Sequence, residues 1–381
     1  MDFKTRDHYR HVIEKVARRC NFSEIEVAQK ASELAKKGAE VNGINDRTAH
    51  VGYFLIGKGL PQLERLTKVK RSPASVFRKL ISRFPLFFYL GSIILLTLTF
   101  CWILLEKADD DGLGGWHIWI FGVLLTLCTS YMSIAIVNWL ATLFVRPHPL
   151  PRLDYSHGIP PESMSLVIIP AMILNPQNIE ELTESLEVRF LANQEKNLHF
   201  GLLTDFRDSG QEKMDDDEAL LQLVSKKITD LNQKYQGEDN DIFFLFHRPR
   251  RWNPNDGIWM GYERKRGKLA DLNSVLRGGS EKAFSLIIGN RKIMTKIKYV
   301  ITLDTDTQLP RDSAQQFVGA MSHPLNKPVF DSKKHCVTEG YSILQPRVAV
   351  SLPGTNRSGY AKLFGHEPGI DPYTRAVSDV Y

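Results

Sequence analysis

Cysteine is scarce in this sequence, and its distribution excludes two common ways of stabilising a domain. The chain has 381 residues and only 4 cysteines. They are widely scattered, at Cys20, Cys101, Cys128 and Cys336. No two of them have the spacing of a zinc site, and two lie in strongly apolar segments. We therefore expect neither a disulfide framework nor a structural zinc site.

Internal repeats and low-complexity tracts are also absent, and the average composition is that of a globular chain. Hydrophobic residues make up 43% and charged residues 24% of the sequence, which excludes a disordered or fibrous protein. The 49 basic residues barely exceed the 43 acidic ones. Such a small excess is weak support for nucleic-acid binding, and we expect no nucleic-acid partner. The length is sufficient for two or three structural units.

Two stretches contain no charged residue at all. Residues 85–105 and 116–145 lack Asp, Glu, Lys and Arg, and about 20 apolar residues in a helix are enough to cross the ~30 Å hydrocarbon core of a bilayer. The pattern predicts two transmembrane helices, at about residues 85–105 and 118–145. Two buried core helices are the alternative, although core helices rarely run so long without a charge. Both stretches begin far from Met1, which argues against a signal peptide.

The charges that flank these stretches predict their orientation. Residues 65–84 contain seven Lys or Arg and no acid, whereas the loop at residues 106–115 contains four acids and one Lys. Basic residues favour the cytoplasmic side of a membrane. We therefore expect a multi-pass protein of the inner (cytoplasmic) membrane, with both termini in the cytoplasm and the short loop outside.

The chain divides into four regions. Helical periodicity and a capping box at Ser23 and Glu26 predict a helical cytoplasmic region over residues 1–84, to which the sequence assigns no role. The two transmembrane helices occupy residues 85–145. Closely spaced prolines predict a stiff linker over residues 146–163. Residues 164–381 form the last region.

In residues 164–381, strands alternate with helices. Apolar runs predict strands at residues 165–169, 199–203, 242–246, 299–303 and 341–344, and periodicity predicts helices at residues 179–192, 218–235 and 269–276. The first strand is expected to end at Pro170. This alternation is typical of an α/β fold with a mostly parallel sheet flanked by helices. Ligands of such sheets bind beyond the carboxyl ends of the strands.

The sharpest motif is Tyr-Val-Ile-Thr-Leu-Asp-Thr-Asp, at residues 299–306. In extended backbone, Asp304 and Asp306 lie on the same face, where two carboxylates repel each other unless a cation lies between them. Mg²⁺ or Mn²⁺ suits such oxygen ligands and could also neutralise a leaving diphosphate. We expect a metal site at Asp304 and Asp306, with a capped loop as the alternative.

Two further polar residues follow or precede regular elements. Asp205 ends the second predicted strand and is a candidate acceptor for a nucleobase or ribose, with a loop or capping role as the alternative. Lys268 follows Gly267 where a helix opens, and both its ammonium and the helix amino end attract phosphate. An ordinary exposed lysine is equally compatible with that spacing, and the P-loop pattern is absent.

The weakest candidates lie near the end of the sequence. Gln345 and Arg347 follow the strand predicted at residues 341–344, and Arg347 could bind phosphate or sugar or form a surface ion pair. Glu367 and Asp371 are weak candidates for a general base, with solvated loop positions as the alternative.

Taken together, these motifs resemble those of the inverting, membrane-bound nucleotide-sugar glycosyltransferases of the cellulose-synthase-like kind. They occur in that family's order: the strand end at Pro170, Asp205, Gly267-Lys268, Asp304-x-Asp306 and Gln345-Pro346. Longer phrases are similar to the glycosyltransferase module of cyclic β-1,2-glucan synthases, at residues 49–53, 250–254, 259–268 and 367–381. The resemblance covers nearly the whole chain.

The resemblance implies a GT-A-like fold, UDP-glucose as donor and a growing β-1,2-glucan as acceptor. It also implies a divalent cation, Mg²⁺ or Mn²⁺, at Asp304 and Asp306, with Asp205 at the uridine and Lys268 at the donor. The remaining candidate substrate-binding residues are Asp304, Gln345 and Arg347. The expected reaction is glucose transfer with inversion at the anomeric carbon.

The sequence departs from the family's pattern at its end. The Thr-Glu-Asp base and the Gln-x-x-Arg-Trp motif that follow the Gln-Pro segment of cellulose synthases are missing. We therefore expect the catalytic base beyond Tyr381, and a fragment that lacks the C-terminal domains of a full-length synthase. Two alternatives stay open: a non-catalytic membrane anchor or scaffold of a larger synthase, and a glycosyltransferase with another acceptor, such as a lipid phosphate or a different polysaccharide.

Overall fold

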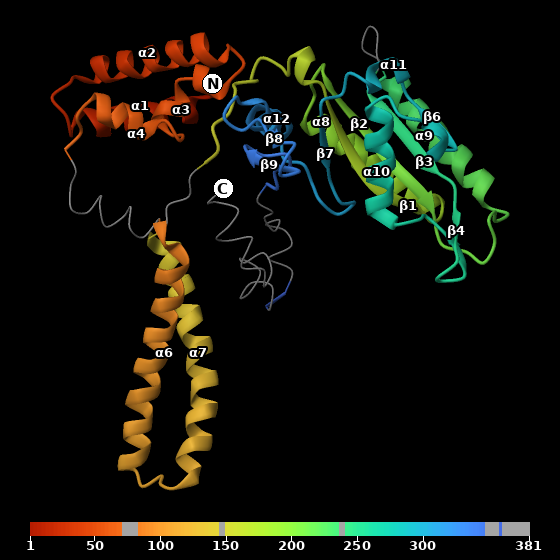
Figure 1. Cartoon of the computed structure of the whole chain (residues 1–381). Helices are drawn as coiled ribbons and strands as arrows, with labels where there is room; N and C mark the ends of the chain where they lie inside the picture. Colours follow the sequence, from red (N-terminus) through yellow and green to blue (C-terminus); the bar gives the residue numbers. More distant parts are fainter. Residues whose placement is uncertain (71–82, 145–148, 236–240, 347–357, 360–381) are drawn as a thin grey trace. The chain divides into compact units, whose positions relative to one another are not determined.

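The computed structural model describes residues 1–70, 83–144, 149–235, 241–346 and 358–359. The chain forms two compact units. One consists of Met1–Arg6 and Pro151–Ser342, and we call it the α/β unit. The other consists of Asp7–Leu150 and Ile343–Tyr381. Figure 1 shows the elements of both in the colours of the sequence.

Helices make up the described part of the N-terminal region, as the sequence predicts. They are α1 (Phe3–Ala17), α2 (Glu24–Asn42), the 3₁₀ turn η1 (Arg47–Ala49), α3 (Gly52–Leu55) and α4 (Leu60–Leu66). The predicted capping box begins α2: the Ser23 hydroxyl accepts a bond from the Glu26 N–H, and the Glu26 carboxylate accepts one from the Ser23 N–H. Helices α2, α3 and α4 pack against one another (Figure 1).

The two uncharged stretches form a helical hairpin, with α6 (Pro85–Asp110) packed against α7 (Trp116–Phe144). Both helices are long and apolar enough to cross a membrane. Only 11% of the apolar window of α6 and 17% of that of α7 are buried, which argues against the alternative of soluble core helices. Polar contacts join the pair, since the Tyr89 hydroxyl donates to Asn138 at 2.9 Å and the Cys101 and Thr129 side chains meet at 3.0 Å.

A five-stranded sheet forms the centre of the α/β unit, in the order β6-β3-β2-β1-β7. Its strands are β1 (Ser165–Ile173), β2 (Leu198–Phe206), β3 (Phe243–Arg248), β6 (Leu286–Ile288) and β7 (Tyr299–Thr302). Only the edge strand β6 is antiparallel to its neighbour. The predicted mostly parallel sheet is therefore confirmed. Because β2 and β3 lie on one side of β1 and β7 on the other, the strand order reverses at β1.

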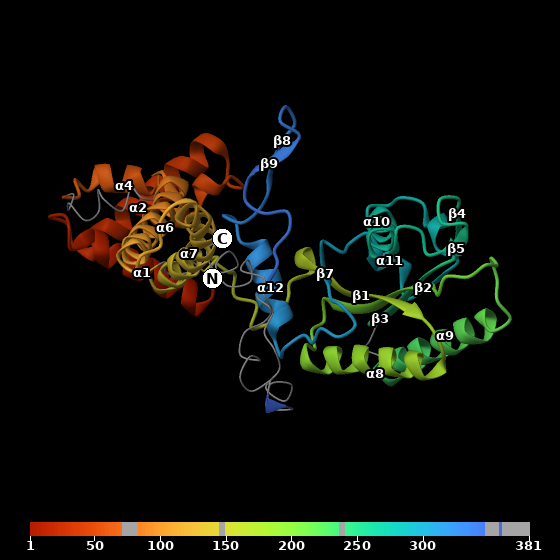
Figure 2. The same cartoon turned by 90° about the horizontal axis from the view of Figure 1, so that it is seen from below.

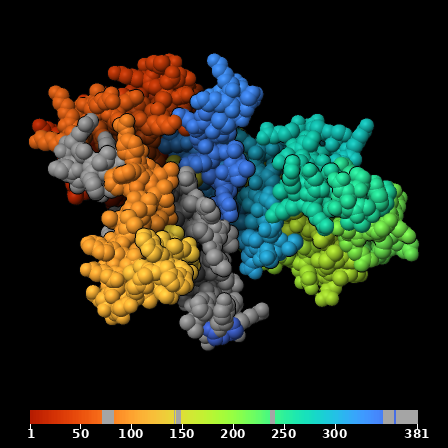
Figure 3. Space-filling model, turned by 60° about the horizontal axis from the view of Figure 1, so that its bottom comes forward, coloured from red at the N-terminus to blue at the C-terminus, as the bar shows by residue number. Residues whose placement is uncertain are grey.

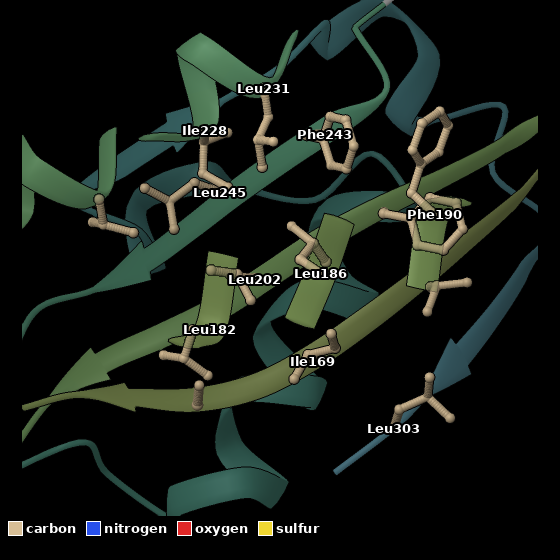
Figure 4. Close-up of a cluster of buried hydrophobic side chains, with 14 of the residues drawn as sticks. Ile169, Leu182, Leu186, Phe190, Leu202, Ile228, Leu231, Phe243, Leu245 and Leu303 are labelled. Carbon is tan, nitrogen blue, oxygen red and sulfur yellow. The ribbon is translucent and has the colours of Figure 1, made fainter. Parts of the chain in front are cut away.

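Helices cover both faces of the sheet. Figure 2 shows α8 (Pro176–Ala192) and α9 (Asp217–Lys234) on one face, with α10 (Arg264–Leu276) and α11 (Arg291–Met294) on the other. Alternate residues of each strand feed the two apolar clusters, as the two-residue period of a strand requires. On β2, Leu202 enters the cluster under α8 and α9, whereas Leu203 enters the cluster under α10. Figure 4 shows the first of these clusters, and Figure 3 shows the close packing of the green and teal segments of the unit.

Smaller elements complete the unit. They are η2 (Pro161–Ser163), the hairpin β4 (Arg251–Asn253) and β5 (Ile258–Met260), η3 (Glu281–Ala283), α12 (Ser313–Ser322), and the hairpin β8 (Val329–Asp331) and β9 (Cys336–Glu339). The strand predicted at residues 341–344 is wrong, because residues 343–346 have no regular secondary structure and residue 342 is a bend.

Strand β1 does not end at Pro170, as the sequence suggested, but continues to Ile173. Its neighbour β7 stops at Thr302, which pairs with Ile168. The Ile168 carbonyl accepts from the Leu303 N–H at 3.1 Å, so the backbone N–H and C=O groups of even-numbered residues in β1 point towards β7. Pro170 lies beyond the last residue of β1 that pairs with β7, so the N–H that proline lacks would have had no partner strand on that side.

Candidate functional site

A cavity of about 270 Å³ lies at the carboxyl ends of β1 and β2. Residues 170–172 of β1 form part of its wall, together with Asp205, the start of α10 and Thr305, which follows β7. Parallel sheets bind ligands at such a position, outside the strand ends where the strand order reverses. The structure therefore brings three of the predicted segments to one place: the end of β2, the segment around Gly267, and the segment around Asp304.

Asp205 reaches the cavity because of its position on β2. It lies two residues after Leu203 and therefore on the same face of the sheet, under α10. Register sets Asp205 opposite Arg248 of β3. The Asp205 carboxylate forms ion pairs with Lys268 at 2.8 Å and with Arg248 at 3.5 Å, and all three residues are buried. Asp205 is the penultimate residue of β2 and does not lie in a loop after the strand.

Lys268 is the cation at the centre of the site. Its residue is only 4% exposed, so it is not an ordinary surface lysine. The ammonium donates to the Ala171 carbonyl at 2.6 Å as well as to Asp205, and so joins α10 to both β1 and β2. Burial lowers the pKa of Lys268 from its ordinary value, although the attraction of Asp205 opposes the change. The helix begins five residues earlier than the predicted start at residue 269, at Arg264, so Lys268 lies in its second turn.

Arg248 supports this pair from behind and was not found in the sequence. Its guanidinium donates to Asp271 at 2.7 Å and to the Tyr262 and Arg264 carbonyls at 3.1 and 3.4 Å. It therefore fixes the chain that leads into α10 relative to Asp205. A basic residue at the end of a buried strand was the available signal.

The segment before α10 follows a tight path. A Cβ atom on Gly261 would lie 2.0 Å from the Asp205 carboxylate, so only glycine fits there. Glu263 and Arg264 follow with φ angles of 54° and 48°, values that L residues rarely adopt. Backbone strain of this kind clusters at ligand-binding segments.

Positive charge gathers where α10 begins. Arg264, Lys265 and Lys268 all line the cavity. Arg264 pairs with Asp208 at 2.5 Å, and Lys265 pairs with Asp304. Both of these outer pairs are partly exposed, so they exchange readily with solvent or a ligand. The arrangement suits an anionic ligand with several phosphate oxygens.

Asp304 and Asp306 lie in a turn and not in extended backbone, so the derivation of their shared face from strand geometry is wrong. Strand β7 ends at Thr302, and the Thr307 N–H donates to the Asp304 carbonyl at 3.1 Å to close the turn. Both carboxylates are exposed. Thr305, between them, lines the cavity, which brings the pair to its rim.

The residues of this turn fit a cation that is shared with a ligand. Mg²⁺ is commonly held by one or two carboxylates and by substrate phosphates. Asp304 pairs with the Lys265 ammonium at the rim of the cavity, and because both side chains are exposed this pair can open to admit another cation. Among the residues that the structure describes, no three His, Cys, Asp or Glu side chains cluster closely enough to hold a metal. A ligand would have to supply the remaining oxygens.

Comparison with known proteins identifies the relationship. No protein-family model matches the chain. The chain is 36% identical, over 387 aligned residues, to the cyclic beta-(1,2)-glucan synthase NdvB of Rhizobium meliloti (strain 1021). This chain is a relative of that synthase. The alignment covers 100% of the chain but only 14% of the length of NdvB. The resemblance indicated by the sequence motifs is thus confirmed.

Of the remaining predicted site residues, the structure describes only Gln345, which is not among the residues that line the cavity. Gln345 is exposed, lies in no strand and falls outside the α/β unit. Arg347, Glu367 and Asp371 lie outside the described residues. Their assignments stay predictions.

Proposed function

We propose that this relative of NdvB forms the donor-binding part of a membrane-bound, inverting glycosyltransferase. In this proposal it transfers glucose from UDP-glucose to a growing β-1,2-glucan. The observation that carries the proposal is the cavity at the sheet edge, where the buried Asp205–Lys268 pair, the basic start of α10 and the Asp304–Thr307 turn meet. The similarity to a cyclic beta-(1,2)-glucan synthase supports the choice of acceptor, and the motifs that resemble those of nucleotide-sugar glycosyltransferases support UDP-glucose as the donor.

The side chains of the cavity have distinct roles in this proposal. Lys268 and Lys265 attract the diphosphate, and Asp205 accepts a hydrogen bond from the uracil or ribose. Each Asp205 oxygen has one cationic partner, and an ionised carboxylate offers about four acceptor sites. Capacity for a ligand therefore remains. The volume of about 270 Å³ falls just below the ~300–1,000 Å³ usual for ligand pockets, so the described residues enclose only part of the donor.

Asp304 and Asp306 are the proposed metal-binding residues. A bound Mg²⁺ or Mn²⁺ would neutralise charge on the leaving diphosphate. For Asp304 to hold the cation, its ion pair with Lys265 must open. The Lys265 ammonium is then available to a phosphate oxygen. The acceptor hydroxyl forms the new bond to the anomeric carbon as the bond to UDP breaks, and its proton passes to a carboxylate base.

Calorimetric titration of the chain with UDP-glucose, with and without Mn²⁺, tests the proposal. Binding should require Mn²⁺ and should be lost when Asp304→Ala is combined with Asp306→Ala. Asp230→Ala on α9 is the matched control, because it removes an exposed carboxylate of the same unit that does not line the cavity. Metal-independent binding that survives the double substitution would refute the site.

A second experiment separates the competing functions. Membranes that contain only this chain are incubated with labelled UDP-glucose. Formation of any glucan excludes a purely structural anchor or scaffold, and linkage analysis of the product distinguishes β-1,2-glucan from another acceptor product.

The proposed site requires access to cytoplasmic UDP-glucose. We propose that α6 and α7 cross the inner membrane with both chain ends in the cytoplasm, which rests on the lopsided charges at residues 65–84 and 106–115. A reporter that is active only in the cytoplasm, fused after Tyr381, should be active, whereas an export-dependent reporter should be silent. The reverse pattern would overturn the orientation.

A further inference from the structure

Arg189 of α8 is a buried cation outside the site residues considered so far. It is only 3% exposed. Among the residues that the structure describes, no carboxylate forms an ion pair with it. A buried charge is costly unless hydrogen bonds compensate for its lost hydration, so its partners indicate why it is there.

Those partners are backbone carbonyls of the Asp304–Thr307 turn. One terminal nitrogen, Nη2, donates to the Thr305 and Thr307 carbonyls at 2.9 and 2.6 Å and lies 3.4 Å from the Asp304 carbonyl. Nε donates to Thr307 at 3.0 Å. The other terminal nitrogen, Nη1, donates to the carbonyl of Ser185 at 2.9 Å and to its hydroxyl. The guanidinium thus joins α8 to three carbonyls of one turn.

This contact fixes both the shape and the charge balance of the turn. One backbone bond closes it, from Thr307 to Asp304, and the Arg189 fork adds donors in a rigid plane that a lysine could not reproduce. The guanidinium also lies close enough to Asp306 for their attraction to oppose the lowering of the pKa of Arg189 by burial. A fixed positive charge beneath the turn offsets repulsion between its two carboxylates.

The residue that caps the carboxyl end of the same helix extends the anchor. Asn193 lies one helical turn after Arg189, and its amide donates to the Leu309 carbonyl at 3.4 Å. Its carbonyl accepts from the Ala314 N–H at 3.1 Å, at the start of α12. The end of α8 therefore holds the whole connection between β7 and α12.

We propose that Arg189 is a positioning residue for the metal site: it holds the Asp304–Thr307 turn in the conformation that presents both carboxylates at the rim of the cavity. The consequence for metal binding rests on the proposed function. The fixation of the turn does not, so the two can fail separately.

The decisive variant is Arg189→Lys in the full chain, in detergent micelles. It keeps the charge but removes the fork. Hydrogen exchange of peptides that cover residues 303–309 should become about tenfold faster or more, because hydrogen bonds from a charged donor are among the strongest. Affinity for UDP in the presence of Mn²⁺ should fall by a similar factor. Arg250→Lys is the matched control: Arg250 is also 3% exposed but pairs with Asp217, so this change should leave exchange at residues 303–309 as in the wild type.

Ser185→Ala is a milder variant that keeps the guanidinium and removes one of its acceptors. Exchange at residues 303–309 should rise by about threefold, which tests the proposal even if Arg189→Lys does not fold. If Arg189→Lys folds and its exchange is unchanged, the proposal is overturned. If Arg189→Lys does not fold, unchanged exchange in Ser185→Ala overturns it. Faster exchange with unchanged Mn²⁺–UDP affinity would overturn the link to metal binding. A wild-type chain that binds no Mn²⁺–UDP would refute the proposed function, and exchange would still decide the role of Arg189.

Discussion

The buried pair of Asp205 and Lys268 provides the most stringent test of the site's electrostatics. Their side chains are 3% and 5% exposed and 2.8 Å apart. Removing one partner of a buried ion pair leaves an uncompensated charge, which commonly costs about 3–5 kcal/mol of unfolding free energy. The third member, Arg248, makes the two possible deletions unequal.

Asp205→Asn should be the more damaging change. It leaves the Lys268 ammonium with neutral acceptors alone, the Ala171 carbonyl and the new amide oxygen, and no negative charge to compensate it, so we expect the full loss of about 3–5 kcal/mol. Lys268→Met leaves the Asp205 carboxylate with Arg248 at 3.5 Å, so we expect a smaller loss of about 1–3 kcal/mol. In the double variant no buried charge is stranded, since Arg248 keeps Asp271. Its loss should therefore be well below the sum of the two single losses.

Urea unfolding of the full chain in detergent, followed by pulse proteolysis, measures these differences. Glu180→Gln is the matched control, because Glu180 and Lys227 are also 2.8 Å apart but are largely exposed; little change is expected there. The reasoning is refuted if Asp205→Asn costs no more than this control. It is also refuted if Lys268→Met proves the more destabilising of the two, since Arg248 would then not compensate Asp205.

Three further outcomes are expected. Asp304→Asn and Asp306→Asn should each leave the melting temperature of the ligand-free chain nearly unchanged, because both carboxylates are exposed. Each should abolish most of the stabilisation by bound ligand, which is ~2.7 kcal/mol at a ligand concentration of 100 times the dissociation constant. Thermal melts with and without Mn²⁺ and UDP-glucose measure both effects. Burial lowers the pKa of His199 and of His247 from 6.5 to about 4, so between these pH values the unfolded state binds more protons than the folded state. The free energy of unfolding should therefore fall as the pH drops from 6.5 towards 4, by up to about 3 kcal/mol for each histidine. Equal midpoints in urea titrations at pH 7 and pH 4.5 would contradict this. Gly261→Ala should lose donor affinity and about 1–3 kcal/mol of stability, because its methyl group would lie 2.0 Å from the paired Asp205 carboxylate; calorimetry and melting temperature report the two losses.

The core of the fold could be predicted because its signals are local. Apolar runs mark β1, β2 and β3, and helical periodicity marks α8 and α9 between them. Errors arose where an element depends on distant neighbours. Pro170 interrupts no pairing only because β7 stops early, and α10 begins with residues whose positive φ angles no local preference would suggest.

The site was predictable by residue type but not by geometry. Asp205 and Lys268 were found from their places near the ends of regular elements, yet their ion pair depends on strand register and on the packing of α10. The turn at Asp304 was expected to be extended because the sequence does not indicate where β7 ends. Arg189 was missed, although a signal exists: it lies three residues after Leu186 on the buried stripe of α8, where a charge requires partners.

The pairing of β7 with β1, across a large sequence separation, has a consequence for the order of folding. Strands β1, β2 and β3 are joined by successive crossovers through α8 and α9, whereas β7 pairs with β1 through only four residues at a large sequence separation. Contacts between distant segments form slowly, because a long loop must close first. The first three strands are therefore expected to assemble before β7 docks. Substitutions in β7 should then speed unfolding and leave the refolding rate nearly unchanged, and the carboxylates that follow β7 would be the last part of the site to reach their native positions.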